Sequence, residues 1–431
     1  MLRYQMVGEG YYDVLVGTRL ALFLPIHDVA IHILFDPDEY GHSSDQYPRY
    51  HSFYTLLDKV DLTGGELHIV GTVPDLALYL GLQNGYFQAR IAPTAKDSRN
   101  HSIKQVTYEQ KKSTLTRLAQ KTIAENLSSR KNTIIWVQKT GYSAALGCSD
   151  CGYYYCCSDC DVALRYYQRE KYLQCPRCGK KVIPEDFCPQ CRGTWMKTWG
   201  EGVEKIFQFL KRSFPGVPVV KAVSDQNNQN FAEDVPEPMI MVGTSAVLRE
   251  EVLSRASLFI IHSFEDWLFI PDFLLREKLY QDIHRAIHFL GGENPIKTQV
   301  LIETSKQYQK YTDQFFLPIT EFYKIELDKR KKYNYPPWRC FLQVVARSRN
   351  KEDRYLVLNS VKNQFNHEQI LIDGPFPSVS TLKKSAWSDQ LVIKFDLQYL
   401  GMVYDKIIGM VGSRKMNGVE IDFRVLNTLA P

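Results

Sequence analysis

Residues 148–191 have the sequence CSDCGYYYCCSDCDVALRYYQREKYLQCPRCGKKVIPEDFCPQC. Four Cys-x-x-Cys pairs fall within this stretch, and each spacing lets a tight turn present two thiolates to one tetrahedral ion. The pairs are Cys148/Cys151, Cys157/Cys160, Cys175/Cys178 and Cys188/Cys191. Eight thiolates and no histidine predict two closed four-cysteine zinc sites that leave no coordination position open. We therefore expect two structural zinc ions rather than catalytic ones.

The loops between the pairs indicate which pairs share an ion. Five residues separate the first pair from the second, a short span for folding back onto one ion, whereas 14 separate the second from the third, close to a zinc ribbon. Residues 163–167 and 171–174 predict a hairpin across 168–170. We assign one zinc to the outer cysteines and one to the inner cysteines: Cys148, Cys151, Cys188 and Cys191, and Cys157, Cys160, Cys175 and Cys178. We expect Cys156 and Cys340 to be spectators.

The bulk composition is that of a globular protein. The 431 residues are 44% hydrophobic and 23% charged, and this length predicts about three domains. The N-terminus lacks the basic and apolar regions of a secretory signal, and the apolar stretch 21–35 is interrupted well before it could span a membrane. We expect a soluble, cytoplasmic protein without a membrane partner. In that reducing compartment, closely spaced cysteines indicate metal rather than disulfides.

The formal net charge of +5 needs a correction before it is related to nucleic acid. Each zinc ion with four thiolates carries −2, so two sites leave about +1. Net charge therefore gives no support for DNA binding, and any basic patch must be local. Two groups are candidates for nucleic-acid contact, although each is also typical of a solvated surface. They are Lys329, Arg330, Lys331 and Lys332, and Lys383, Lys384 and Trp387.

The alternation of short apolar runs with helix-like stretches predicts parallel α/β packing over the first 100 residues. There we expect buried strands at 12–16, 32–35 and 67–70 and helices at 54–60 and 76–80, followed by a polar, helix-compatible stretch at 101–131. A second α/β unit has expected strands at 133–138, 217–223, 239–242 and 258–262 and helices at 202–214 and 273–290. After a long charged helix from about 308, an α+β pattern follows, with strands at 341–347, 390–396 and 419–426 and helices at 352–365 and 398–412.

Several further segments carry a family resemblance. They are VGTRLALFLP at 16–25, PRYH at 48–51, GYS at 141–143, WGEGVE at 199–204, FPG at 214–216, YPPW at 335–338 and GPFP at 374–377. With the cysteine spacing, these segments resemble the primosomal protein N′ (PriA) family of replication-restart helicases, in the same order along nearly the whole chain. The resemblance implies an α/β fold of two RecA-like helicase lobes, the first incomplete, with an inserted module of two four-cysteine zinc sites and an α+β C-terminal domain. The nested zinc pairing also holds in that family.

The resemblance also implies domain boundaries. It places a partial first lobe at 1–100, a connector and the start of the second lobe at 101–140, and the zinc module at 141–198. The remainder of the second lobe is expected at 199–305 and the C-terminal domain at 306–431.

The departures from the family concern ATP hydrolysis. The sequence contains no G-x-x-x-x-G-K-[ST] phosphate loop, and it begins downstream of where that loop lies, so we expect the N-terminal DNA-binding domain to be absent too. At the family's DEEH box stands Asp36-Pro37-Asp38-Glu39, with proline in the glutamate position. The GTQMLAKGH-like motif has become GTSAVLREE at 243–251. The Q-x-x-GRAGR element falls on RAIHFLGG at 285–292 and has lost both arginines, which would stabilise charge on the γ-phosphate.

We favour a PriA-like zinc protein of replication restart or primosome assembly that binds forked or single-stranded DNA, or replication-restart proteins, and does not hydrolyse ATP. No catalytic residue is assigned. One alternative is an active ATP-dependent 3′-5′ DNA helicase, using ATP and Mg²⁺ and completed by a separate polypeptide. Another is a zinc-stapled protein-interaction scaffold without nucleic-acid contact, which the corrected charge favours slightly.

Overall fold

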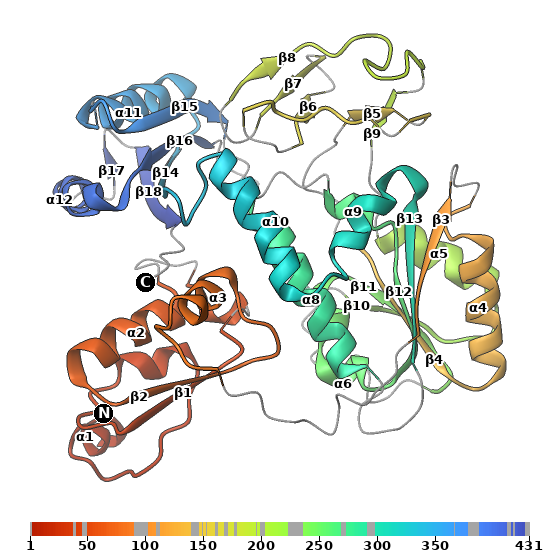
Figure 1. Cartoon of the computed structure of the whole chain (residues 1–431), viewed down its shortest axis with the longest axis horizontal. Helices are drawn as coiled ribbons and strands as arrows, with labels where there is room; N and C mark the ends of the chain where they lie inside the picture. The colour runs from red at the N-terminus through yellow and green to blue at the C-terminus, as the bar shows by residue number, and fades with distance from the viewer. Residues whose placement is uncertain are drawn as a thin grey trace. The chain divides into compact units, whose positions relative to one another are not determined.

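The computed structural model divides the chain into two compact units, Met1–Tyr79 and Leu80–Pro431 (Figure 1). The residues that it describes are 2–37, 40–44, 50–89, 102–108, 113–138, 146–148, 150–151, 153–159, 163–167, 171–175, 179–194, 196–198, 203–222, 236–268, 273–290, 298–365, 367–377, 388–411, 415–416 and 419–426.

The first unit is built on a two-stranded parallel sheet. Strand β1 (Ile31–Phe35) pairs with β2 (Glu66–Val70), and helix α2 (Ser52–Thr63) makes the crossover between them. The helix begins after His51, whose ring accepts a hydrogen bond from Phe53 N. The strands predicted at 32–35 and 67–70 and the helices predicted at 54–60 and 76–80 are confirmed. The remaining helical segments here are α1 (Leu2–Gly8), η1 (Arg19–Phe23), η2 (Tyr40–His42) and α3 (Leu76–Gln83).

One face of the β1–β2 sheet is open to water, which corrects the prediction that both strands are buried. Ile31, Ile33 and Phe35 alternate along β1 with exposed fractions of 55%, 57% and 63%. The alternate residue Leu34 is 7% exposed, so the two faces differ sharply. Parallel sheets usually have both faces covered. Among the described residues this sheet has only two strands, and one of its faces remains bare.

The prediction of a strand at 12–16 is wrong. Within residues 2–37 the first strand is β1, and Val14 and Val16 are 77% and 95% exposed. Apolar residues form a strand only where a neighbouring strand satisfies the backbone hydrogen bonds.

A six-stranded parallel sheet forms the centre of the second unit, in the order β10-β11-β4-β12-β13-β3. Its strands are β3 (Ser102–Tyr108), β4 (Asn132–Trp136), β10 (Val219–Ala222), β11 (Ile240–Gly243), β12 (Ala256–Ile261) and β13 (Gln299–Ser305). Every residue of β4 is buried, as expected for a parallel strand with both faces covered. Apart from β3 and β13, these strands were predicted and are confirmed.

Helices cover both faces of this sheet (Figure 1). On one face α4 (Arg117–Ser128) and α5 (Val203–Ser213) pack their apolar residues against Ile135 and Val137, while α8 (Leu275–Phe289) covers the other. The predicted helices at 202–214 and 273–290 are confirmed as α5 and α8. Shorter helices are η3 (Ser245–Leu248), α6 (Glu250–Leu253), α7 (Glu265–Leu268) and η4 (Lys306–Tyr308).

The edge strand β3 was not predicted. Its sequence SIKQVTY is polar, and 101–131 was expected to be helix-compatible, which is correct only for α4. An edge strand needs little apolar character, because one of its sides faces solvent. Backbone pairing with β13 over the whole of 102–108 holds it in the sheet instead.

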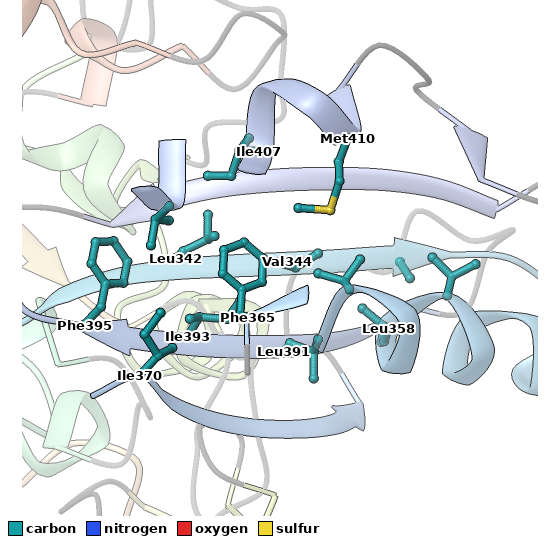
Figure 2. Packing of buried hydrophobic residues seen from close by; sticks show 14 of the residues in the cluster. Leu342, Val344, Leu358, Phe365, Ile370, Leu391, Ile393, Phe395, Ile407 and Met410 are labelled. Carbon is teal, nitrogen blue, oxygen red and sulfur yellow. The ribbon is translucent and has the colours of Figure 1, made fainter. Parts of the chain in front are cut away.

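The C-terminal part of the second unit is an antiparallel sheet in the order β15-β16-β14-β18-β17, with α11 (Lys351–Gln364) and α12 (Leu400–Val411). Its strands are β14 (Cys340–Arg347), β15 (Leu371–Pro377), β16 (Ser388–Phe395), β17 (Lys415–Met416) and β18 (Val419–Leu426); η5 (Leu397–Tyr399) precedes α12. Figure 2 shows the core, in which Leu342 and Ile393 of the sheet meet Phe365 and Ile407. The expected α+β elements are confirmed.

Strand β15 was missed because it contains Gly374-Pro375-Phe376-Pro377. Prolines predict a turn, and a strand tolerates them only at a sheet edge or a bulge. The structure provides both: β15 is the edge strand beside β16, and its register shifts between Asp373 and Phe376.

The long helix predicted from about 308 is divided into α9 (Gln309–Gln314) and α10 (Ile319–Lys332), because Pro318 starts a new helix. Buried ion pairs attach α10 to α8. Arg330 Nη2 lies 2.6 Å from Glu277 Oε2 and its Nε lies 3.2 Å from Glu326 Oε1. Arg276 Nε lies 3.1 Å from the other oxygen of Glu326. None of the described helices has the length and apolar character that crossing a membrane requires.

Replacing Arg330 by methionine should lower the free energy of unfolding by about 3–5 kcal/mol, because the buried carboxylate of Glu277 would lose its ion pair with Arg330 and Glu326 would keep only Arg276. Urea unfolding followed by circular dichroism measures the change. Lys324→Met is the matched control: Lys324 is exposed on the same helix, so its replacement should change stability by no more than about 0.5 kcal/mol. Equal unfolding of the two variants would contradict the role given to these ion pairs.

Candidate metal centre and nucleic-acid interface

The two ends of the cysteine-rich segment are paired with each other. Strand β5 (Leu146–Cys148) runs antiparallel to β9 (Met196–Thr198), which follows the last cysteine pair. An antiparallel pair brings the beginning and end of the segment side by side. The first and last Cys-x-x-Cys turns therefore meet, although most of the cysteine-rich segment lies between them.

Four sulfur atoms converge at this junction. The thiols of Cys148, Cys151, Cys188 and Cys191 all lie within 4.8 Å of one another. Cys148 Sγ is 3.6 Å from Cys191 Sγ, and Cys151 Sγ is 3.5 Å from Cys188 Sγ. Tetrahedral zinc with bonds of about 2.3 Å would place its sulfur ligands about 3.8 Å apart. The donor set and its spacing therefore fit one zinc ion.

Backbone groups shape the two turns. Asp150 N donates a hydrogen bond to Cys148 Sγ, and Gly193 N donates one to Cys191 Sγ, each at 3.4 Å. Such bonds stabilise a thiolate because they place positive hydrogens beside its charge. A Cβ at Gly193 would collide with the Asp150 carboxylate and come within 3.2 Å of Cys191 Sγ, so a larger residue here would force the Asp150 side chain to move.

The inner pairs are described only in part. Cys157 and Cys175 are buried, at 3% and 0% exposure, in a cluster with Leu164 and Leu173. Cys160 and Cys178 lie outside the described residues. The predicted hairpin is confirmed: β6 (Arg165–Tyr167) pairs antiparallel with β7 (Tyr172–Gln174), and β8 (Lys181–Val182) extends it.

The two remaining cysteines lie elsewhere. Cys156 is exposed, and Cys340 is buried in β14. Neither belongs to the outer four-sulfur group.

The cysteine-rich segment also packs on the six-stranded sheet's unit. Tyr154 and Ala163 pack with Tyr308 and Leu268, and the rings of Tyr154 and Tyr308 are 6.1 Å apart. Burial raises the pKa of both tyrosines, so their hydroxyls remain neutral at physiological pH. This contact positions the module against the segment that follows β13.

The predicted basic cluster is not uniform. Lys331 and Lys332 are exposed at the end of α10, and Lys329 is partly buried. Arg330 is 1% exposed and paired with Glu277 and Glu326, so it is not accessible to a phosphate, which corrects the prediction for that residue. The other predicted group, Lys383, Lys384 and Trp387, lies outside the described residues.

Sequence analysis missed an aromatic surface beside the lysines. Trp338 is 47% exposed, and Lys331 Nζ lies 5.1 Å from the centre of its ring. Nearby is a cavity of about 150 Å³. The residues around it are Tyr154, Ala163, Trp267, Leu268, Phe273, Leu275, Arg276, Tyr311, Glu326, Lys329, Arg330, Tyr333 and Tyr335. The available signal was the YPPW segment that follows the basic run.

A second cavity, of about 160 Å³, lies at the carboxyl end of the parallel sheet. The chain leaves β4 toward β10 and leaves β12 toward β13, so the two neighbouring strands form a topological switch point. Ligands of open α/β sheets bind at such points. The cavity is lined by Trp136, Gln138, Thr244, Ser245, Trp267, Leu275, Lys278, Leu279 and Asp282.

A closed polar network occupies the same edge nearer β3. His262 Nδ1 lies 2.7 Å from Glu303 Oε2, and both side chains are almost fully buried. The other oxygen of Glu303 accepts a hydrogen bond from Thr116 N at the start of α4. Glu265 accepts hydrogen bonds from the Tyr108 hydroxyl and from Ser305 N. The network therefore joins β3, α4, β12 and β13.

Fold and site together define the class. This is an α/β protein whose parallel sheet receives a cysteine-rich module between β4 and β10 and is followed by an α+β domain. The α/β fold class expected from the sequence is confirmed.

Comparison with curated proteins finds relatives that share one name. Replication restart protein PriA of Borreliella burgdorferi is 24% identical over 434 residues, which cover 96% of this chain and 63% of that protein. The protein of the same name from Thermotoga maritima is 23% identical over 421 residues, covering 95% and 56%. That from Bacillus subtilis is 22% identical over 407 residues, covering 88% and 49%. The chain is therefore similar to PriA replication restart proteins along most of its length, and it spans 49% to 63% of the length of these relatives.

Other comparisons add less. No protein-family model matches the chain. Among solved structures, S. cerevisiae Dbp5 bound to RNA and ADP BeF3 has a TM-score of 0.35 and 10% identity, covering 71% of this chain and 64% of that one. RecG bound to a three-way DNA junction has a TM-score of 0.38 and 10% identity, covering 77% and 34%.

The outer four-cysteine group predicts how metal content responds to mutation. Cys188→Ser should remove one zinc equivalent per chain, because a site with three thiolates binds the ion less tightly. Cys156→Ser is the matched control and should leave the zinc content unchanged. Elemental analysis of the purified protein measures both variants. Equal zinc content in Cys188→Ser and wild type would contradict this assignment.

Proposed function

We propose that this chain is a zinc protein of replication restart that binds forked or single-stranded DNA, or replication-restart proteins, and does not hydrolyse ATP. The similarity to PriA proteins over 96% of the chain supports the process. One observation is the main support for the proposed loss of ATP hydrolysis: a buried proline occupies the position where the family's glutamate would act.

That proline is Pro37, directly after β1. Asp36 N donates a hydrogen bond to Val70 O, the last residue of β2, so Asp36 and Pro37 lie at the carboxyl end of the parallel β1–β2 pair. Helicases of this kind use an aspartate there for Mg²⁺ and a glutamate to position the attacking water. Proline has no group that can accept a proton from water or orient it. Asp36 alone therefore does not complete a site for ATP and Mg²⁺.

The second unit supports the same conclusion. The arginine element of the family is expected near the end of α8, where His288 and Phe289 form the last turn. The polar network at the sheet edge contributes the carboxylates of Glu265 and Glu303, which are 1% and 0% exposed. Both carboxylates are closed off from solvent and accept hydrogen bonds from Thr116 N, the Tyr108 hydroxyl and Ser305 N, so this network offers none of the exposed cations that phosphoryl transfer requires.

Two places on the chain support the proposed DNA binding. Lys331 and Lys332 bring positive charge to an exposed helix end, where phosphates can reach them. The cavity beside Thr244 and Ser245 lies at the carboxyl end of the sheet and offers hydroxyl and amide groups to a ligand. These features favour a DNA-binding protein over a scaffold that makes no nucleic-acid contact.

Two zinc ions complete the proposal. The outer ion would be held by the four cysteines whose sulfur atoms converge, and the inner one by Cys157, Cys160, Cys175 and Cys178. Both ions would be structural, since four thiolates leave no position for substrate. Their role would be to fix a segment that has little hydrophobic core of its own.

Binding and hydrolysis should separate when the full chain is assayed. Fluorescence anisotropy with labelled forked and single-stranded DNA should show binding at low salt, while phosphate release from ATP stays at background with or without DNA. Pro37→Glu should not restore hydrolysis, because the sequence also lacks a phosphate-loop motif. DNA-stimulated ATPase that Asp36→Ala abolishes would overturn the proposal. Absence of DNA binding at low salt would favour the protein-interaction alternative.

A further inference from the structure

We propose that Trp338 is a stacking platform for an unpaired base of single-stranded DNA, and that Lys331 and Lys332 hold the adjacent phosphates. This inference rests on the proposed DNA binding and assigns it a place on the chain. The site lies where α10 ends and the chain turns toward β14.

Trp338 has the properties of a platform rather than of a core residue. Its side chain is 47% exposed, whereas Trp136 and Trp267 are each 3% exposed. The ring is nevertheless held in place, because its Nε1–H donates to Leu327 O at 3.3 Å and its backbone N donates to Tyr335 O at 3.0 Å. A large ring that is both exposed and fixed can stack on a base at little cost in conformational entropy.

Positive charge lies beside aromatic faces at this site. Lys331 Nζ is 5.1 Å from the Trp338 ring centre, and Lys332 Nζ is 5.0 Å from that of Tyr333. Nucleotides combine an aromatic base with an anionic phosphate, so this alternation of rings and cations matches their chemistry.

The other charged side chains near Trp338 do not cancel the positive charge of Lys331 and Lys332. Beneath them, Arg330 and Arg276 are matched by Glu277 and Glu326. Arg339, next to Trp338, is paired with Asp396 at 3.3 Å. Asp328 is exposed on the same helix but is outnumbered by Lys331, Lys332 and the partly buried Lys329. The surface at the end of α10 is therefore positive.

The nearby cavity extends the site. Tyr333, over which Lys332 lies, also lines the cavity of about 150 Å³ together with Tyr154 and Tyr311. A cavity of about that volume accommodates one six-membered ring in a well-studied engineered protein. A strand whose phosphates follow the lysines could thus place one base on Trp338 and a neighbouring one against the tyrosines.

Binding of fluorescein-labelled dT15 to the full chain tests the inference by anisotropy. Trp338→Leu should weaken binding about 5- to 150-fold, the effect of losing one stacked base. Trp338→Phe should retain most of the affinity, because it keeps a ring. Lys331→Met and Lys332→Met should each reduce the salt dependence, the slope of log K against log salt concentration, by about 0.7. A blunt 15-base-pair duplex should bind Trp338→Leu as it binds wild type, since its bases are not free to stack.

The matched controls are Tyr404→Leu and Lys324→Met. Tyr404 is an exposed aromatic residue on α12, and Lys324 is an exposed lysine earlier on α10. Neither replacement should change dT15 binding. If Trp338→Leu unfolds, loss of dT15-induced quenching of tryptophan fluorescence in Trp338→Phe provides the second readout.

The outcomes separate this inference from the proposed function. Wild-type binding to dT15 that Trp338→Leu leaves unchanged would overturn the stacking site while DNA binding stands. Equal weakening for dT15 and duplex would also overturn it, because it would indicate a structural role for the ring. Failure of the wild-type chain to bind either DNA would remove the proposed function and this inference together.

Discussion

The convergence of four thiols from the two ends of one segment is the constraint on which the middle of this structure depends. Cys148 and Cys188 are fully buried, and their partners complete a sulfur group whose spacing suits one tetrahedral ion. The apolar cluster of this segment is small, so the burial of hydrophobic side chains alone gives the segment little stability. The pairing of β5 with β9 serves this geometry, and the hairpin between these strands packs Leu164 and Leu173 into the small apolar cluster beside Cys157 and Cys175.

Sequence spacing predicted this part well because metal ligation depends on short-range turns. The hairpin and the pairing of the first Cys-x-x-Cys turn with the last could be inferred from loop lengths, whereas the pairing of the two inner turns stays a prediction. Edge strands could not, because partner strands rather than their own residues decide them: β3 is polar and β15 contains two prolines. The opposite error occurred at 12–16, where an apolar run forms no strand and remains exposed.

The basic residues show the same limit of prediction from sequence. The basic run from Lys329 to Lys332 is continuous in sequence, but the helix turns Arg330 inward to Glu277 while Lys331 and Lys332 face water. Periodicity alone did not reveal this, because the partner carboxylate comes from α8, far earlier in the chain. Trp338 was missed for a similar reason: a tryptophan is usually buried, and only the structure shows that this ring is held at the surface.

The bare row of Ile31, Ile33 and Phe35 on β1 affects how the molecule behaves in solution. Large apolar side chains on a sheet that contacts water favour self-association, and an unpaired strand edge offers a template for it. Excluded salts such as sulfate strengthen that tendency, because they raise the cost of wetting apolar surface. A strip of three side chains far in sequence from the cysteines therefore adds to the apolar surface through which this protein can self-associate.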